Sequence, residues 1–172
     1  MIERKGAFTF RNREMTVIGE DVKPGNIAAE FEVLDQDFMP FKGLEGTAGK
    51  VRIIAAVPSL ETSVCDRETR RFNQEAANLS KDIAILVVST DLPYTQKRWC
   101  GAAGIDQVTV VSDALSKDFG AKYGVVLKEV GVFRRAIFVV DKKDTIAYAA
   151  YMPALGDEPN YEEVLNAARK LV

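Results

Sequence analysis

Apolar residues follow two patterns along this chain: short, nearly continuous runs and stripes with a helical period. The runs Val51–Val57 and Ile83–Ser89 are rich in β-branched residues, which is typical of strands buried on both faces of a sheet. Between them, four residues recur at helical offsets, as on one face of a helix: Cys65, Phe72, Ala76 and Leu79. Strand, helix and strand in this order predict a parallel βαβ unit with a right-handed crossover.

Further elements flank this unit on both sides. Residues 7–10 and 15–18 alternate apolar and polar positions about a polar turn, which predicts an N-terminal β-hairpin. Residues 31–34 and the segment leading to Phe41 predict a second, exposed hairpin. Toward the C-terminus the pattern predicts a strand, a short helix, two paired strands and a last amphipathic helix, over residues 108–111, 116–123, 135–140, 145–151 and 161–171.

A second helix is predicted to begin at Pro93 and to pass through Cys100. Proline suits the first turn of a helix because it has no N–H group to leave unpaired. The predicted ends of this helix are a cap at Thr90 or Asp91 and a glycine stop at Gly101 or Gly104. Cys100 therefore lies near its C-terminal end.

The order of these elements predicts an α/β chain with a thioredoxin-like fold. Helices flank a central mixed sheet, and residues 1–20 add the N-terminal hairpin. With 172 residues, 47% of them apolar, we expect one domain over residues 1–172 with a substantial core. Such folds place their chemistry at the carboxyl ends of strands and at helix N-termini.

The charge and hydropathy of the chain argue against two kinds of partner, nucleic acids and membranes. The formal net charge is −2, and the basic pairs are scattered among acidic residues, so we expect no nucleic-acid partner. The first residues lack the apolar core of a secretory leader, and no run approaches the roughly 18 apolar residues of a membrane helix. We therefore expect a cytoplasmic protein with no membrane association.

The chain contains no histidine and only two cysteines, Cys65 and Cys100. The absence of histidine excludes Ser-His-Asp and Cys-His catalysis and the common histidine metal sites. Two cysteines cannot form a cysteine-rich zinc site, and their separation does not match Cys-x-x-Cys. We expect no metal and no cofactor, whereas a disulfide between the two cysteines is chemically possible.

Cys65 falls in the first turn of its predicted helix, where Thr62 or Ser63 can act as N-cap and Asp66 completes a weak capping box with Ser63. Free N–H groups and the helix dipole favour a thiolate at this position. Lowering a cysteine pKa from about 8.5 to roughly 6 requires about 3.4 kcal/mol. A helix end supplies only ~0.3–2 kcal/mol, so a cation or further donors must assist.

Five ordered blocks of sequence resemble the peroxiredoxins, and more narrowly the bacterial thiol peroxidases, which are atypical two-cysteine peroxiredoxins. The first block is Pro58-x-x-x-Thr62-x-x-Cys65 with Thr69-Arg70-Arg71-Phe72-Asn73 behind it. The others are Ser89-Thr90-Asp91-Leu92-Pro93, Gln96-Lys97-Arg98-Trp99-Cys100-Gly101-Ala102, Arg135-Ala136-Ile137-Phe138-Val139 and Glu158-Pro159-Asn160-Tyr161-Glu162. The resemblance covers nearly the whole chain.

The resemblance implies a role for each of five residues. Cys65 would be the peroxidatic cysteine, which attacks a hydroperoxide and becomes a sulfenic acid, and Cys100 the resolving cysteine. Thr62 would hydrogen-bond the thiolate and the peroxide, and Arg135 would supply the cation. Pro58 would shield the sulfur from water.

The resemblance also implies a catalytic cycle and its partners. Thioredoxin would reduce the intrachain disulfide, and the protein would form a homodimer. A disulfide needs its two Cα atoms within about 7 Å, yet each cysteine is predicted on its own helix. We therefore expect oxidation to unwind the first turn of the Cys65 helix and the Trp99-Cys100 segment.

Other interpretations remain open on the residues alone. Either cysteine could be an ordinary buried core residue, since free cysteine is commonly buried. Arg135 could be a plain charge at a strand end, Trp99 a packing residue, and Thr62 only a helix cap. The alternative functions are a thiol-disulfide oxidoreductase and a thioredoxin-like binding or chaperone module with a structural disulfide.

Overall fold

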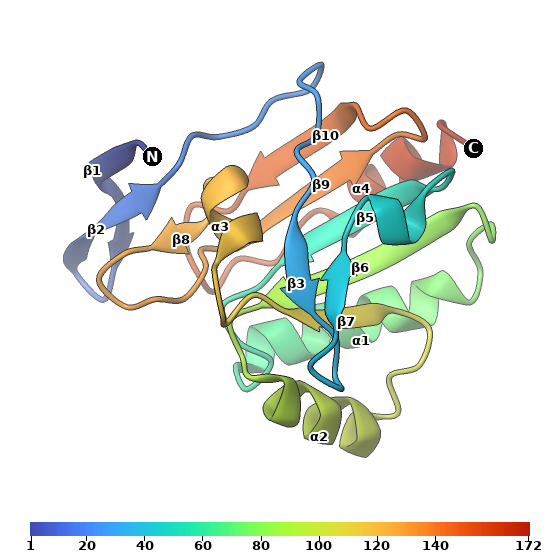
Figure 1. Cartoon of the computed structure of the whole chain (residues 1–172), viewed down its shortest axis with the longest axis horizontal. Helices are drawn as coiled ribbons and strands as arrows, with labels where there is room; N and C mark the ends of the chain where they lie inside the picture. Colours follow the sequence, from blue (N-terminus) through green and yellow to red (C-terminus); the bar gives the residue numbers. More distant parts are fainter.

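A seven-stranded sheet runs through the centre of the molecule (Figure 1), in a computed structural model that describes residues 1–172. Its strands are β3 (Glu32–Leu34), β4 (Pro40–Lys42), β5 (Val51–Ala56), β6 (Ile83–Ser89), β7 (Thr109–Ser112), β9 (Ala136–Val140) and β10 (Ile146–Tyr151). Their order is β10-β9-β5-β6-β7-β3-β4. The β5–β6 and β6–β7 pairs are parallel and the others antiparallel, so the predicted mixed sheet is confirmed.

A smaller sheet, made of β1 (Glu3–Phe10), β2 (Arg13–Ile18) and β8 (Val126–Leu127), lies at the N-terminal end of the molecule (Figure 1). The predicted N-terminal hairpin is confirmed. Its turn is the dipeptide Arg11-Asn12, with φ of +51° and +61°, as a two-residue hairpin loop that follows strand twist requires. The sequence pattern did not reveal β8, because a two-residue strand has no measurable periodicity.

Helices cover both faces of the central sheet. They are α1 (Ser63–Ala76), α2 (Pro93–Ala103), α3 (Asp118–Lys122) and α4 (Tyr161–Arg169), with a short 3₁₀ turn at Glu45–Thr47. One core contains residues of α1, α2 and α4 against one face of β5, and the other contains Phe119 and Tyr123 against the opposite face. Ile53 and Ile54 belong to different cores, which explains why the β5 run is apolar on both faces.

The strand pairing brings three chain segments to one edge of the sheet. Ala56 at the end of β5 pairs with Val88 near the end of parallel β6, and also with Ala136 at the start of antiparallel β9. The segment after β5, the segment after β6 and the residues before β9 therefore meet there. Parallel strands commonly present ligand-binding residues at such an edge.

The predicted second hairpin is present as β3–β4, and Leu34 also pairs with Ser112, which joins the hairpin to the central sheet. The predicted ends of α2 are only partly right. Neither Thr90 nor Asp91 caps α2, whose N-cap residue is Leu92 with no side-chain hydrogen bond. Gly104, with φ of +68°, does end α2 as predicted. No helix combines the length and apolar character needed to cross a membrane.

Candidate active site

Cys65 is the third residue of α1 and is fully buried. Thr62 is the N-cap, and its hydroxyl oxygen accepts a hydrogen bond from the Cys65 N–H at 3.1 Å. Ser63 is already helical, and the Asp66 carboxylate pairs with Arg70, so the predicted capping box does not form. The β5 strand and the Thr62 cap together fix the position of the sulfur.

Arg135 lies directly against the Cys65 sulfur. Its Nη2 donates to Cys65 Sγ at 3.2 Å and also to the Leu155 carbonyl oxygen at 2.9 Å, while its Nε donates to the same carbonyl at 3.2 Å. Only 1% of Arg135 is exposed. Burying a guanidinium is costly unless it is paired, so the partners of Arg135 inside the core must compensate for its burial.

Glu68, one helical turn after Cys65, forms the other contact of the guanidinium. Arg135 Nη1 donates to Glu68 Oε2 at 2.5 Å, and both side chains are 1% exposed. Burial raises the pKa of Glu68 to about 7, against the opposing effect of Arg135. The second carboxyl oxygen, Oε1, has no hydrogen-bond partner, which adds to the cost of the charged form.

Arg134 and Arg135 point in opposite directions. Arg134 donates from Nη2 and Nε to the Gly124 carbonyl oxygen and pairs with Asp21, on the side of the N-terminal hairpin. Successive residues of an extended segment alternate between faces, which accounts for this division. Of the two arginines, only Arg135 reaches Cys65.

The Asp91 side chain holds the loop before α1 in place by hydrogen bonds. Its carboxylate accepts hydrogen bonds from the Ser59 hydroxyl at 2.7 Å, from the Leu60 N–H at 2.8 Å and from the Ser89 hydroxyl at 2.7 Å. Pro58, at the start of this loop, is buried. The aspartate that the sequence suggested as a cap of α2 thus holds the segment that leads to Cys65.

Cys100 lies in α2 and is 6% exposed. Both cysteines are free thiols, and both belong to the core between the sheet and helices α1, α2 and α4. The Cys100 sulfur accepts a hydrogen bond from Gln36 Nε2 at 3.5 Å. The structure therefore groups Cys65, Thr62 and Arg135 tightly, and places Cys100 in the same core with separate polar contacts.

Four groups at these sites were not found from the sequence: Glu68, Leu155, Asp91 in its present role, and Gln36. Glu68 had a detectable signal, because it is a charged residue on the same helix face as Cys65 and Phe72. The Leu155 carbonyl is a backbone group, and every residue has one, so the sequence does not show that this one binds Arg135. Gln36 contacts a residue 64 positions away, so no local pattern reveals it.

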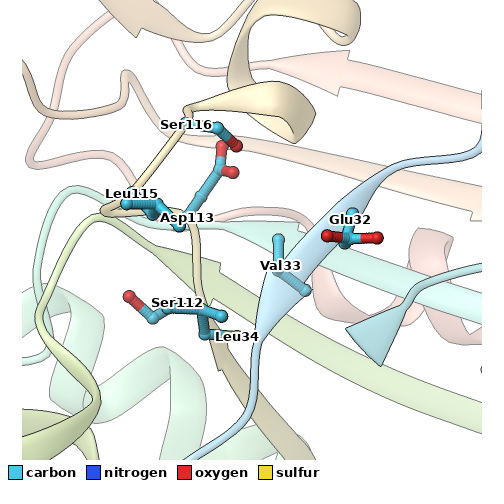
Figure 2. Close-up of a pocket in the computed structure, with 7 residues that line it drawn as sticks. All are labelled: Glu32, Val33, Leu34, Ser112, Asp113, Leu115 and Ser116. Carbon is cyan, nitrogen blue, oxygen red and sulfur yellow. The ribbon is translucent and has the colours of Figure 1, made fainter. Parts of the chain in front are cut away.

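A separate small hollow of about 30 Å³ lies between β3 and the segment after β7. Figure 2 shows the Asp113 carboxyl group directed toward Ser116, while Ser112 extends the other way. Asp113 accepts the Gly120 N–H at 2.8 Å, and burial raises its pKa to about 6. A space of this size holds about one water molecule, so the hollow is too small for a substrate.

Comparison with known proteins agrees with this geometry. The model of the AhpC/TSA family matches residues 24–149. The thiol peroxidase of Oceanobacillus iheyensis is 47% identical over 162 residues, which cover 94% of this chain and 98% of that protein. The thiol peroxidase of Bacillus subtilis is 43% identical over 164 residues, which cover 95% of this chain and 97% of that protein.

The fold of this chain is also similar to that of solved structures. The crystal structure of a peroxiredoxin-like protein from Aquifex aeolicus superposes with a TM-score of 0.88 at 37% identity, covering 98% of both chains. The likeness includes the thioredoxin-like sheet and nearly the full length of the chain. This chain belongs to the thiol peroxidases, enzymes of the AhpC/TSA family of peroxiredoxins.

Proposed function

We propose that Cys65 is the peroxidatic cysteine of a hydroperoxide reductase. Its thiolate attacks one oxygen of the peroxide, so that an S–O bond forms as the O–O bond breaks. The leaving oxygen takes a proton and departs as water or an alcohol, and Cys65 becomes a sulfenic acid. The observation that carries this proposal is the 3.2 Å contact between Arg135 Nη2 and the buried Cys65 sulfur.

Arg135 and Thr62 act on the charge that develops in this step. The fixed guanidinium favours the thiolate and stabilises the negative charge on the leaving oxygen, a stronger effect in a buried site than in water. Thr62 places its hydroxyl beside the first turn of α1, where it can also bond the peroxide. Pro58 shields the sulfur. Because Cys65 has no exposed surface, the groups that cover its sulfur must move to admit the peroxide.

Cys100 is the resolving cysteine in this proposal. Its thiolate attacks the sulfur of the sulfenic acid, an S–S bond forms, the S–O bond breaks, and hydroxide leaves as water after protonation. Cys65 and Cys100 are held in separate helices. We therefore propose that the first turn of α1 and the Trp99-Cys100 segment unwind to let the disulfide form.

The external reductant in this proposal is thioredoxin, whose dithiol reduces the disulfide by thiol exchange. The protein acts in the cytoplasm as a homodimer. Exposed apolar side chains at the start of α2 and in the neighbouring turn support an interaction surface there: Phe38, Met39, Leu92 and Tyr94. Sedimentation of the reduced and oxidised protein tests the dimer directly.

Peroxide-dependent oxidation of NADPH, coupled through thioredoxin and its reductase, tests the activity. We expect turnover with hydrogen peroxide and with small organic hydroperoxides, and we expect Cys65→Ser to abolish it. A chaperone or binding module would keep its activity in Cys65→Ser, and a general thiol-disulfide oxidoreductase would reduce disulfides without peroxide.

The resolving role is tested separately with Cys100→Ser. This variant should consume one equivalent of peroxide and then stop, because its sulfenic acid has no intrachain partner. Full thioredoxin-linked turnover by Cys100→Ser would contradict the assignment of Cys100 while leaving that of Cys65 intact.

A further inference from the structure

The tip of the β3–β4 hairpin lies against helix α2, as Figure 1 shows at the lower end of the sheet. Three successive residues of this tip contact α2. Gln36 reaches Cys100, Asp37 pairs with Lys97 at 2.8 Å, and the Phe38 ring lies 4.8 Å from the Tyr94 ring. The turn therefore follows α2 from its first residues to Cys100.

Hydrogen bonds between residues of this turn fix its conformation. The Asp35 carboxylate accepts the N–H groups of Asp37 at 2.8 Å and of Met39 at 2.9 Å, and the Asp35 N–H donates to the Met39 carbonyl oxygen. Phe38 adopts a φ of +63°, a conformation that a bulky residue takes only when its surroundings require it. A turn held this firmly can present one side chain in a defined position.

That side chain is Gln36, which is half-buried and whose Nε2 lies 3.5 Å from Cys100 Sγ. An amide is a neutral donor, and a thiolate is a far better acceptor than a thiol. Burial raises the pKa of the Cys100 thiol, and the Gln36 hydrogen bond opposes that rise. The nearby charges are paired elsewhere, Lys97 with Asp37 and Asp66 with Arg70.

We propose that Gln36 is a catalytic residue of the resolving step, in which its side-chain amide stays bonded to the Cys100 thiolate while the Trp99-Cys100 segment unwinds and until that sulfur attacks the oxidised Cys65. This inference rests on the proposed resolving role of Cys100. Cys100 must lose a proton before the S–S bond forms and hydroxide leaves, and no histidine exists in the chain to act as base. A donor aimed at the sulfur makes that ionisation easier.

Gln36→Leu removes the donor at similar size, and Gln36→Glu replaces it with a group that repels a thiolate. A hydrogen bond to a charged group changes an equilibrium constant, here that for ionisation of the Cys100 thiol, by roughly a factor of ten or more. In a Cys65→Ser background, the pH midpoint for alkylation of Cys100 should move upward by about one pH unit in Gln36→Leu and further in Gln36→Glu. Asp37→Asn is the control for a change in the same turn: it breaks the exposed pair with Lys97, and it should not move the midpoint upward.

In the two-cysteine protein, Gln36→Leu should slow disulfide formation roughly threefold, because a less acidic thiol is also a better nucleophile and offsets about half of the tenfold loss. The initial reaction of Cys65 with peroxide should be unchanged, which a defect of the fold would not allow. An unchanged alkylation midpoint in both Gln36 variants would overturn the proposal. Full thioredoxin-linked turnover by Cys100→Ser would instead overturn the resolving role of Cys100, on which the proposal for Gln36 rests.

Discussion

Trp99 donates its indole N–H to the Asp66 carboxylate at 3.1 Å, which joins the residue before Cys100 to the residue after Cys65. The guanidinium of Arg70 pairs with the same carboxylate at 2.5 Å and lies 5.7 Å from the centre of the Trp99 ring. The two helices that carry the cysteines are therefore tied together beside both sulfurs. Unwinding of either segment must break this contact.

Trp99 is the only tryptophan of the chain and is 8% exposed, so its fluorescence should report oxidation. One equivalent of peroxide should shift its emission to longer wavelength, because the proposed unwinding takes the Trp99-Cys100 segment out of the core. Stopped-flow fluorescence, with parallel counting of free thiols, measures the two events together.

Cys100→Ser provides the control for this signal, since its Cys65 can be oxidised but forms no intrachain disulfide. Its emission should stay close to that of the reduced protein. Quantitative disulfide formation in the unsubstituted chain without any change in Trp99 emission would contradict the local unwinding.

Arg135→Lys should lower the rate constant for oxidation of Cys65 by roughly 10²–10³-fold. Lysine keeps the charge but cannot bridge the sulfur, Glu68 and the Leu155 carbonyl at once, as the planar guanidinium does. The rate is measured under single-turnover conditions with hydrogen peroxide.

The neighbouring arginine supplies the matched comparison. Arg134 is also buried, and its bonds hold Gly124 and Asp21 together, away from Cys65. Arg134→Lys should therefore reduce thermal stability and leave the oxidation rate within a few-fold. Equal losses of rate in the two variants would show that Arg135 acts on the fold rather than on the sulfur.

Glu68 should make the stability of the protein depend on pH. Its pKa is raised from 4.5 to about 7 in the folded state, so the folded state binds more protons than the unfolded state between these values. Its contribution is fully present below pH 4.5 and is lost as the pH rises through 7. The loss amounts to at most about 3 kcal/mol.

Denaturant unfolding between pH 4.5 and 8 measures this effect against Glu68→Gln, which keeps an acceptor for Arg135 but does not titrate. The stability of the unsubstituted protein relative to the variant should fall as the pH rises. A constant stability difference over this range would argue against a raised pKa of Glu68.

Thr62 can contribute to the stability of α1 as its cap and to the rate of Cys65 oxidation through its hydroxyl, and two substitutions separate these contributions. Thr62→Val removes the cap of α1 and should cost about 1 kcal/mol of stability, while Thr62→Ser keeps the hydroxyl and should preserve both stability and rate. If Thr62 also bonds the peroxide, Thr62→Val will slow oxidation of Cys65 well beyond the effect of the lost cap. A normal oxidation rate in a merely destabilised Thr62→Val would restrict Thr62 to capping.

Elements with strong periodicity were predictable from the sequence. The runs that became β5 and β6, and the stripe through Cys65 and Phe72, are signals that tertiary context did not override. Short elements such as β8 and the ends of α2 depend on pairing with distant segments. Local sequence carries little information about such pairing.

Some features of the candidate site were also predictable from local sequence, and others were not. The place of Cys65 in a first helical turn follows from local spacing, and the need for a cation follows from the energy of ionisation. Which arginine supplies it depends on the register between β5 and β9, and only the resemblance singled out Arg135. Contacts such as Gln36 with Cys100 and Arg135 with the Leu155 carbonyl join distant segments and require the folded structure.

The opposite orientation of Arg134 and Arg135 restricts how the length of this chain can change during evolution. Inserting or deleting one residue beside β9, without an absorbing bulge, would turn each arginine to the other side of the sheet and leave Cys65 without its cation. A change of two residues would restore the alternation. Homologues should therefore tolerate length variation in the Lys128–Gly131 turn, where a loop can absorb it, and resist odd-numbered changes next to the arginine pair.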